Sequence, residues 1–358
     1  MAFDVNKLLR PHIASLLPYS SARDEYSGAE GIFLDANENP LGSITHQAFN
    51  RYPDPYQSDL KKVLSSIKSI PPSHIFLGNG SDEAIDLLFR AFCNPGKDNV
   101  ILLPPTYGMY EVSANINDAA ILKVPLTADF QLDLHRILKE INASTKIIFI
   151  CSPNNPSGNV MRRADILELV KGFHGLVVVD EAYIDFSPEP SIIEEINHHP
   201  NLIVLQTFSK AWGLASLRLG MAFAVPEIIK VLNKIKPPYN ISGLTQKTVL
   251  EAMDNLQKVK EMVSQILGER EVLRHLLDEL PMVQKVYPSD ANFLLVRLAD
   301  PKGMYDYLVK QKIIVRDRSK VLLCEGCLRI TVGTPEENKT LIQAMKSFQP
   351  NTAKVNQQ

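Results

Sequence analysis

The chain has 358 residues, of which 45% are hydrophobic and 22% charged, and its formal net charge is −2. At roughly 100–200 residues per domain, this length predicts two packed units with a sizeable core. The balanced charge indicates no polyanion-binding surface, which argues against nucleic acid as a partner, and no stretch stays apolar long enough to span a bilayer.

The first forty residues are predicted to form an arm. They are rich in Pro, Ser and Asn and show little periodicity, so we expect residues 1–40 to dock on a larger unit. Met1–Lys7 lacks the charged head and apolar core of a signal peptide. The chain contains only four cysteines, which suits a reducing compartment, and we expect a cytoplasmic protein.

Residues 41–265 are predicted to form a large α/β domain. From about Ser81 to Val225, short apolar runs alternate with amphipathic helical patterns. The runs are Val100–Leu103, Lys146–Ile150, Leu176–Val179, Leu202–Leu205 and Gly220–Val225. Their continuous apolar character is typical of strands buried on both faces, hence of a mostly parallel sheet flanked by helices.

A long helical pattern then runs from about Thr245 to Leu280, long enough to leave one domain and enter another. Residues 266–358 are predicted to form a smaller α+β domain. Its expected elements are strands at Val283–Tyr287, Phe293–Val296, Ile313–Val315 and Leu328–Val332, and helices at Met304–Gln311 and Glu336–Phe348. The polar tail from Pro350 to Gln358 is expected to fray.

Polar residues follow several of the buried runs, where parallel sheets bind ligands. Asn155 lies in a rigid turn after Ile150, and Asp180 follows Val179 directly. A carboxylate at such a place pairs with a cation or costs several kcal/mol. Lys210 leaves the next run within a hydroxyl-rich loop, which suits an amine that attacks a carbonyl. The structural alternatives are an ordinary Asx-turn for Asn155, a helix N-cap or a salt bridge for Asp180, and a surface lysine for Lys210.

A glycine-rich turn, Gly78–Ala84, opens a helix, and exposed amides at such a helix start bind phosphate. An ordinary cap by Ser81 or Asp82 is the alternative. The turn is neither GxGxxG nor a P-loop, which argues against nucleotide binding. Tyr107 follows the Val100–Leu103 run and could stack on a planar ring or be a core tyrosine.

A metal site is not expected. Cys324 and Cys327 form a lone CxxC, whereas a structural zinc site needs about four ligands, and the histidines are scattered. We interpret both cysteines as part of a turn between two strands.

Together, a phosphate cradle, an aromatic face, an acid, a phenol, an amide, a lysine and an arginine match what pyridoxal phosphate requires. The chain resembles the fold-type-I pyridoxal-phosphate aminotransferases, most closely the histidinol-phosphate aminotransferases. The segments that carry the resemblance are Leu34–Pro40, Arg51–Pro55, Gly78–Glu83, Pro105–Tyr110, Ser152–Gly158, Val179–Tyr183, Phe208–Gly220 and Cys327–Thr334. They occur in the family's order over nearly the whole chain.

The resemblance implies a role for each site residue. Lys210 would react with the cofactor aldehyde and move the proton, Asp180 would pair with the ring nitrogen, and Tyr183 with Asn155 would bind the phenolate oxygen. The phosphate would be held by Ser81, Asp82, Thr207, Ser209 and Arg218, and Tyr107 would stack on the ring. Tyr52 would reach the phosphate of a neighbouring subunit, so a homodimer is implied.

The resemblance also implies the substrate contacts. Arg329, assisted by Arg316, would bind the carboxylate of glutamate or the phosphate of the amino substrate. Tyr19 and Asn37 would lie near the substrate, with the arm packing on the small domain and the active site. A docking tyrosine, a capping asparagine and a solvated charge run are the alternatives for Tyr19, Asn37 and Arg316.

The expected reaction is amino transfer between L-histidinol phosphate and 2-oxoglutarate. An aromatic or broad-specificity aminotransferase and a threonine-phosphate decarboxylase could keep the same cofactor residues. A pyridoxal-binding regulator without turnover is an alternative from another class, and a Rossmann oxidoreductase lacks its fingerprint here.

Overall fold

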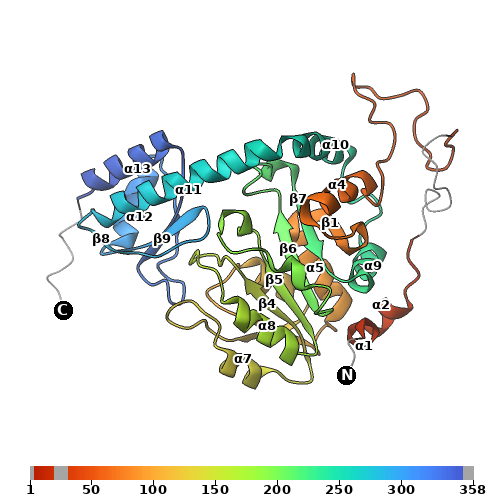
Figure 1. Cartoon of the computed structure of the whole chain (residues 1–358), viewed down its shortest axis with the longest axis horizontal. Coiled ribbons are helices and arrows are strands. Elements are labelled where there is room, and N and C mark those ends of the chain that lie inside the picture. Colours follow the sequence, from red (N-terminus) through yellow and green to blue (C-terminus); the bar gives the residue numbers. More distant parts are fainter. Residues whose placement is uncertain (1–3, 20–30, 350–358) are drawn as a thin grey trace.

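The computed structural model describes residues 4–19 and 31–349 of the chain. Figure 1 shows a large and a small unit linked by the long helix α11 (Leu256–Asp278). Within the described ranges, no helix combines the length and the apolarity needed to cross a membrane.

The large unit is built on a seven-stranded sheet, and the predicted α/β fold is confirmed. Its strands are β1 (Ile75–Asn79), β2 (Asn99–Leu102), β3 (Ala120–Lys123), β4 (Thr145–Cys151), β5 (Leu176–Asp180), β6 (Leu202–Thr207) and β7 (Leu219–Phe223). They lie in the order β1-β7-β6-β5-β4-β2-β3, and all neighbours from β3 to β6 are parallel. Strand β7 is antiparallel to both β6 and β1. All five predicted strands form, whereas β1 and β3 were not predicted.

Helices cover both faces of this sheet. They are α4 (Ser58–Lys68), α5 (Gly80–Phe92), α6 (Met109–Ile116), α7 (Leu134–Glu140), α8 (Arg163–Gly172), α9 (Pro226–Ile235) and α10 (Gly243–Ala252). Alternate residues of one strand enter different cores: Ile148 and Ile150 pack on the side of α8, whereas Ile147 and Phe149 pack on the side of α5. Burial on both faces is the reason for the continuous apolar runs.

The predicted helix from Thr245 to Leu280 is interrupted. A 3₁₀ turn at Met253–Asn255 separates α10 from α11. Asp254 and Asn255 are poor helix formers because their side chains compete for backbone hydrogen bonds. After the break, α11 packs on the core of the large unit through Val259 and on that of the small unit through Leu277.

The small unit has a four-stranded antiparallel sheet in the order β10-β11-β9-β8. Its elements are β8 (Val283–Val286), β9 (Phe293–Leu298), α12 (Pro301–Lys310), β10 (Arg316–Asp317), β11 (Cys327–Thr331) and α13 (Pro335–Ser347). The expected strand at Ile313–Val315 is wrong, because Ile314 is exposed and the ladder begins only at Arg316.

The described part of the arm lies on the large unit. Short helices α1 (Val5–Leu8) and α2 (Pro11–Ser15) pack there: the Arg10 amide donates to the Ala91 carbonyl, and Lys234 Nζ donates to the Ile13 carbonyl. This position differs from the expected one on the small domain. Val5 explains it, because its side chain joins the core beneath α5.

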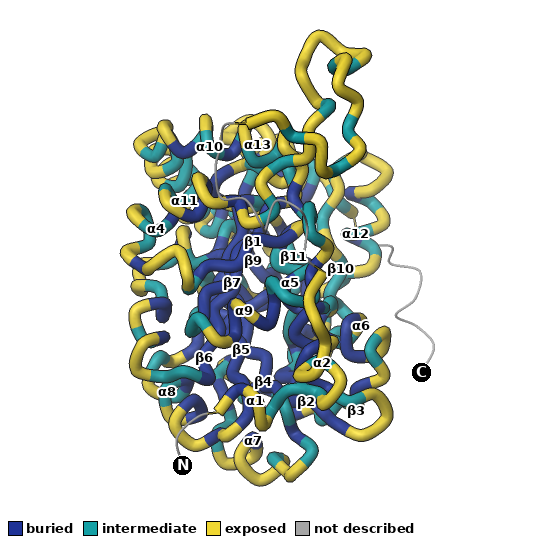
Figure 2. Tube along the Cα trace, turned by 90° about the vertical axis from the view of Figure 1, so that its right-hand side faces the viewer, coloured by how far each residue is buried: buried dark blue, intermediate teal, exposed yellow. Residues whose placement is uncertain are grey.

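Residues 31–52 extend away from the body of the chain, as Figure 2 shows. This segment exposes large apolar side chains at Ile32, Leu34, Leu41 and Ile44, each at least 87% accessible. The resemblance also implies that the arm segment from Tyr19 to Arg23 closes over the substrate. Residues 20–23 of this segment, and the tail from Pro350, lie outside the described residues.

Candidate active site

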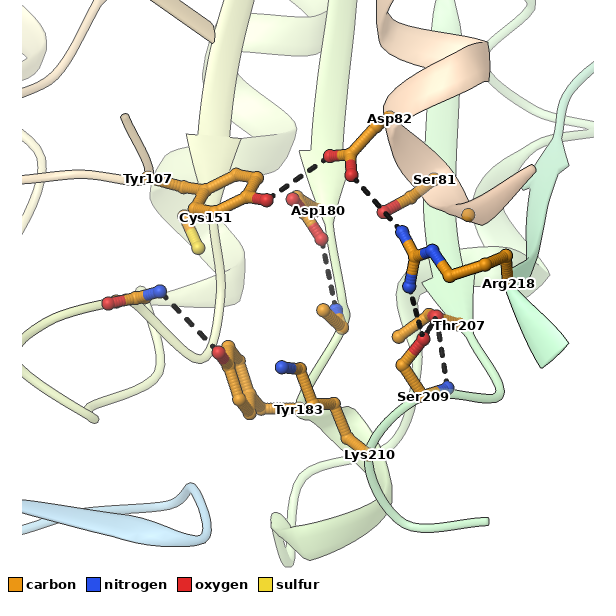
Figure 3. A pocket seen from close by; sticks show the side chains of 13 residues that line it. Ser81, Asp82, Tyr107, Cys151, Asp180, Tyr183, Thr207, Ser209, Lys210 and Arg218 are labelled. Carbon is orange, nitrogen blue, oxygen red and sulfur yellow. Dashed lines mark hydrogen bonds and ion pairs between the residues drawn. The ribbon is translucent and has the colours of Figure 1, made fainter. Parts of the chain in front are cut away.

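A pocket lies at the carboxyl ends of β4, β5 and β6, beside the start of α5 (Figure 3). The chain reaches it through Cys151, Asp180 and Thr207, each the last residue of its strand. Ten predicted site residues line it: Ser81, Asp82, Tyr107, Asn155, Asp180, Tyr183, Thr207, Ser209, Lys210 and Arg218. Gly80, Cys151 and Ala182 also line it and were given no role from the sequence.

One end of the pocket is suited to an anion. Helix α5 begins at Gly80, and no side chain caps its start. The amides of its first turn, including those of Ser81 and Asp82, are therefore suited to bind an anion. A Cβ atom at Gly220 would overlap the Ser81 amide nitrogen, so glycine allows β7 to approach the helix start.

Hydroxyl groups and a guanidinium complete this end. Thr207 Oγ1 lies 3.0 Å from Ser209 Oγ, and Arg218 Nη1 donates to Ser209 Oγ at 3.5 Å. Arg218 Nη1 also donates to the Ala215 carbonyl at 3.3 Å, and Arg218 Nη2 is 3.5 Å from Asp82 Oδ2 in a long and exposed ion pair. Helix dipole, amides, hydroxyls and cation together form a phosphate-sized cradle.

The opposite end contains a buried carboxylate. Asp180 is 3% exposed; its Oδ2 accepts from Tyr110 Oη at 2.6 Å and its Oδ1 from the Ala182 amide at 3.0 Å. Burial raises the pKa of Asp180 to about 6, and the two hydrogen bonds oppose that rise. Among the described residues, no cation lies within hydrogen-bond distance of this carboxylate.

Tyr110 is a site residue that the sequence did not reveal. Its ring stacks on Phe149 at 4.8 Å in the core, while its hydroxyl reaches Asp180 across the strand ends. Its only sequence signal was its place in the Pro105–Tyr110 segment, three residues after Tyr107.

Lys210 projects between these two ends, beside Tyr183 (Figure 3). Its Nζ lies 5.5 Å from the centre of the Tyr183 ring and makes no hydrogen bond or ion pair with the described residues. Desolvation first, and then the positive charge of Arg329, lower the pKa of Lys210, whereas Asp180 raises it. Asn155 Nδ2 donates to Tyr183 Oη at 3.4 Å, which places an amide and a phenol side by side.

The small unit contributes Arg329 at the edge of the pocket. Arg329 Nη1 donates to Asn155 Oδ1 in a short hydrogen bond, and its guanidinium lies 5.1 Å from the Phe293 ring centre. Arg316 stands directly opposite Arg329 in the β10–β11 ladder. The ladder thus sets two cations side by side, and one of them, Arg329, contacts the pocket residue Asn155.

Five predicted residues are not among those that line the pocket within this single chain: Arg329 and Arg316, described above, and Tyr52, Tyr19 and Asn37. Tyr52 is half exposed and stacks on Tyr239 with ring centres 4.5 Å apart. Tyr19 is 74% exposed, and Asn37 is exposed with a left-handed φ of 53°.

The cysteine pair does not form part of the pocket. Cys324 precedes β11 and Cys327 begins it, and both are buried free thiols. Among residues 4–19 and 31–349, no group of three or more His, Cys, Asp or Glu side chains could hold a metal ion.

Comparison with known proteins places this arrangement in a family. Residues 29–345 match the model for aminotransferase class I and II. A histidinol-phosphate aminotransferase of Cytophaga hutchinsonii is 58% identical over 97% of this chain and 100% of that protein. One of Parabacteroides distasonis is 55% identical over 96% of this chain and 99% of that protein.

Solved structures show the same fold. The histidinol-phosphate aminotransferase from Sinorhizobium meliloti in complex with pyridoxal-5'-phosphate superposes with a TM-score of 0.78, at 24% identity, over 87% of this chain and 88% of that one.

Proposed function

The chain belongs to the class I and II aminotransferases, among the histidinol-phosphate aminotransferases, and on this premise we propose its reaction and its site. It transfers an amino group between L-histidinol phosphate and 2-oxoglutarate, giving imidazole-acetol phosphate and L-glutamate, a step of histidine biosynthesis. The observation that carries the site assignment is the pocket itself, where the Lys210 amine stands between a buried carboxylate and an uncapped helix start.

The residues of the pocket fit pyridoxal 5'-phosphate. A buried carboxylate without a cationic partner, Asp180, suits a protonated ring nitrogen, and the uncapped start of α5 with Arg218 suits a phosphate dianion. Tyr107 lines the same pocket and would stack on the cofactor ring, and Lys210 makes no hydrogen bond or ion pair with the described residues. When bound, this cofactor supplies an aldehyde for the amine and an electron sink for the negative charge that develops at the substrate carbon.

The chain's own residues then act by holding charge and moving one proton. Asp180 would keep a positive charge at the ring nitrogen, because an ionised carboxylate in a buried site favours a neighbouring cation. The lowered pKa of Lys210 makes its Nζ available as a base that takes the proton from the α-carbon and returns it. Asn155 and Tyr183 would hold the phenolate oxygen, and Ser81, Asp82, Thr207, Ser209 and Arg218, which line the same pocket, would hold the phosphate.

Arg329 binds a carboxylate of L-glutamate or the phosphate of L-histidinol phosphate, with Arg316 beside it. A planar guanidinium accepts either a carboxylate or a phosphate in a bidentate manner, so one pocket can serve both half-reactions.

The test is turnover with three amino substrates and a covalent trap. Purified protein is offered L-histidinol phosphate, L-phenylalanine and O-phospho-L-threonine with 2-oxoglutarate. We expect glutamate to form fastest with L-histidinol phosphate, and borohydride to fix the cofactor on the Lys210 peptide in wild type but not in Lys210→Ala. A preference for phenylalanine would indicate an aromatic aminotransferase, and release of carbon dioxide from phosphothreonine a decarboxylase. Absence of even a single half-reaction would indicate a regulator.

We further propose that two copies of this chain share their sites, in the cytoplasm. The projecting segment 31–52 exposes apolar side chains that a second copy would cover, and Tyr52 lies on it outside the chain's own pocket. The four cysteines are free thiols, which agrees with a reducing compartment.

Mixing two inactive variants tests the sharing. Tyr52→Ala and Lys210→Ala are each expected to be impaired, and a mixed dimer restores one intact site. Recovery of about a quarter of wild-type activity after subunit exchange supports shared sites. No recovery, with exchange verified by mass, would mean that each chain builds its site alone.

A further inference from the structure

The β10–β11 ladder places a third arginine beside the two already described. Arg316 is opposite Arg329, and the ladder continues one step further, with the Arg318 amide donating to the Cys327 carbonyl at 3.0 Å. Side chains alternate along a strand, so Arg316 and Arg318 emerge on the same face, and Arg318 is the diagonal neighbour of Arg329.

This face of the small sheet is the one that looks toward the large unit. Leu295 and Cys327, which lie on it, belong to the core cluster of the large unit. Leu294 and Leu328, on the opposite face, pack with the helices of the small unit. Arg329 reaches Asn155 from the first of these faces, so all three arginines stand on the pocket side.

These three cations have no carboxylate partner among the residues that the structure describes. None of them takes part in an ion pair, and the nearest acid in sequence, Asp317, accepts from the Ser319 amide at 2.8 Å. The Nε atoms of Arg318 and Arg329 are buried without a hydrogen-bond partner. Like charges that face each other across a ladder destabilise a sheet. Burial first, and then the positive charges of Arg329 and Arg316, lower the pKa of Arg318. A bound phosphate or carboxylate would reduce the repulsion among the three arginines and could accept hydrogen bonds from them.

We propose that Arg318 is a specificity-determining residue, the third cation of the substrate anion subsite, and that it favours a phosphate dianion over a carboxylate. The inference rests on the proposed function, because it concerns how the same pocket ranks its two substrates. The Coulomb energy of a cation at a fixed distance is proportional to the charge of the anion, so Arg318 stabilises a dianion twice as strongly as a monoanion. Arg329 binds the anionic group of either substrate, whereas Arg318 makes the site prefer the phosphate substrate.

The experiment measures both half-reactions in the holoenzyme. Arg318→Gln removes the charge, Arg318→Lys keeps it, and Lys320→Gln removes an exposed charge two residues away as the matched control. If the change lowers kcat/KM about threefold for L-glutamate, it should lower that for L-histidinol phosphate about tenfold, the square of the first factor. Arg318→Lys should keep most of the wild-type preference, and Lys320→Gln should leave it unchanged.

Equal losses for both substrates, no loss for either, or the same loss of preference in Lys320→Gln would overturn the proposal. Inhibition of the glutamate half-reaction by inorganic phosphate gives a second readout. The inhibition constant should rise about tenfold in Arg318→Gln above pH 7, where phosphate is mostly a dianion. An unchanged constant would also overturn the proposal. If the wild-type enzyme does not accept L-histidinol phosphate, the proposed function fails, whereas the phosphate inhibition still decides the role of Arg318.

Discussion

Replacing Asp180 with asparagine is expected to change how the stability of the cofactor-free protein depends on pH. Burial raises the pKa of this carboxyl from 3.8 to about 6 in the folded chain. The unfolded chain therefore loses the proton at lower pH than the folded chain does. Consequently, ionisation of Asp180 makes the folded state progressively less stable as the pH rises from about 4 to about 6, and this penalty is complete above that range.

The magnitude follows from the two pKa values. Each pKa unit corresponds to about 1.36 kcal/mol, so the interval between 3.8 and about 6 amounts to about 3 kcal/mol of unfolding free energy. Roughly half of it, about 1.5 kcal/mol, develops between about pH 5 and pH 7.5. The Asp180→Asn variant lacks this ionisation. Effects of the substitution that are the same at every pH cancel when the change with pH of the variant's unfolding free energy is compared with that of wild type.

Urea unfolding of the cofactor-free proteins, at one protein concentration and a series of pH values, measures the effect. The free energy of unfolding of the variant, relative to wild type, should increase by about 1.5 kcal/mol across the pH 5 to 7.5 range. If the difference in unfolding free energy does not change with pH, ionisation of Asp180 does not destabilise the folded chain and the reasoning is wrong. The same variant should bind the cofactor more weakly, because the anion that favours a cationic ring is gone.

Three further substitutions test other contacts. Tyr110→Phe removes a donor 2.6 Å from the buried carboxylate, worth about 1.5–3 kcal/mol, and should weaken cofactor retention in equilibrium dialysis at neutral pH; unaltered retention would mean that this hydroxyl does not support the site. Gly220→Ala sets a methyl group against the Ser81 amide. It should lower the free energy of unfolding in urea by about 1–3 kcal/mol and also weaken cofactor binding. Unchanged cofactor affinity would mean that the start of α5 does not contribute to phosphate binding. Gly268→Ala, inside α11 with open space around the added carbon, should raise the unfolding free energy by about 0.5–1 kcal/mol, and a lower Tm would contradict that open space.

Much of the sheet and of the pocket could be predicted from the sequence for one physical reason. Strands buried on both faces must be apolar throughout, so their ends are visible where polar residues resume. Asp180 ends such a strand, Asn155 and Lys210 follow theirs by a few residues, and parallel strands bring those ends to one edge.

Contacts between side chains distant in sequence could not be read in this way. The hydroxyl of Tyr110 meets a carboxylate 70 residues away, and only the packing of its ring on Phe149 decides where it points. Strand β3 was missed because it is a sheet edge, where burial is partial and the apolar signal weak. Arg316 and Arg318 lie on the same face as Arg329 because of the register of β10, a strand of two residues. A strand this short has no sequence periodicity from which its register could be predicted.

The position of β1 in the sheet has a consequence for synthesis on the ribosome. Within the described part of the chain, this strand pairs only with β7, which begins 140 residues after β1 ends at Asn79. At about 5–20 residues per second, β1 and the start of α5 wait roughly 7–28 s for their neighbour to be translated. During that interval the nascent chain exposes an apolar strand that could aggregate. The phosphate cradle can form only after β7 and the other pocket residues have been synthesised.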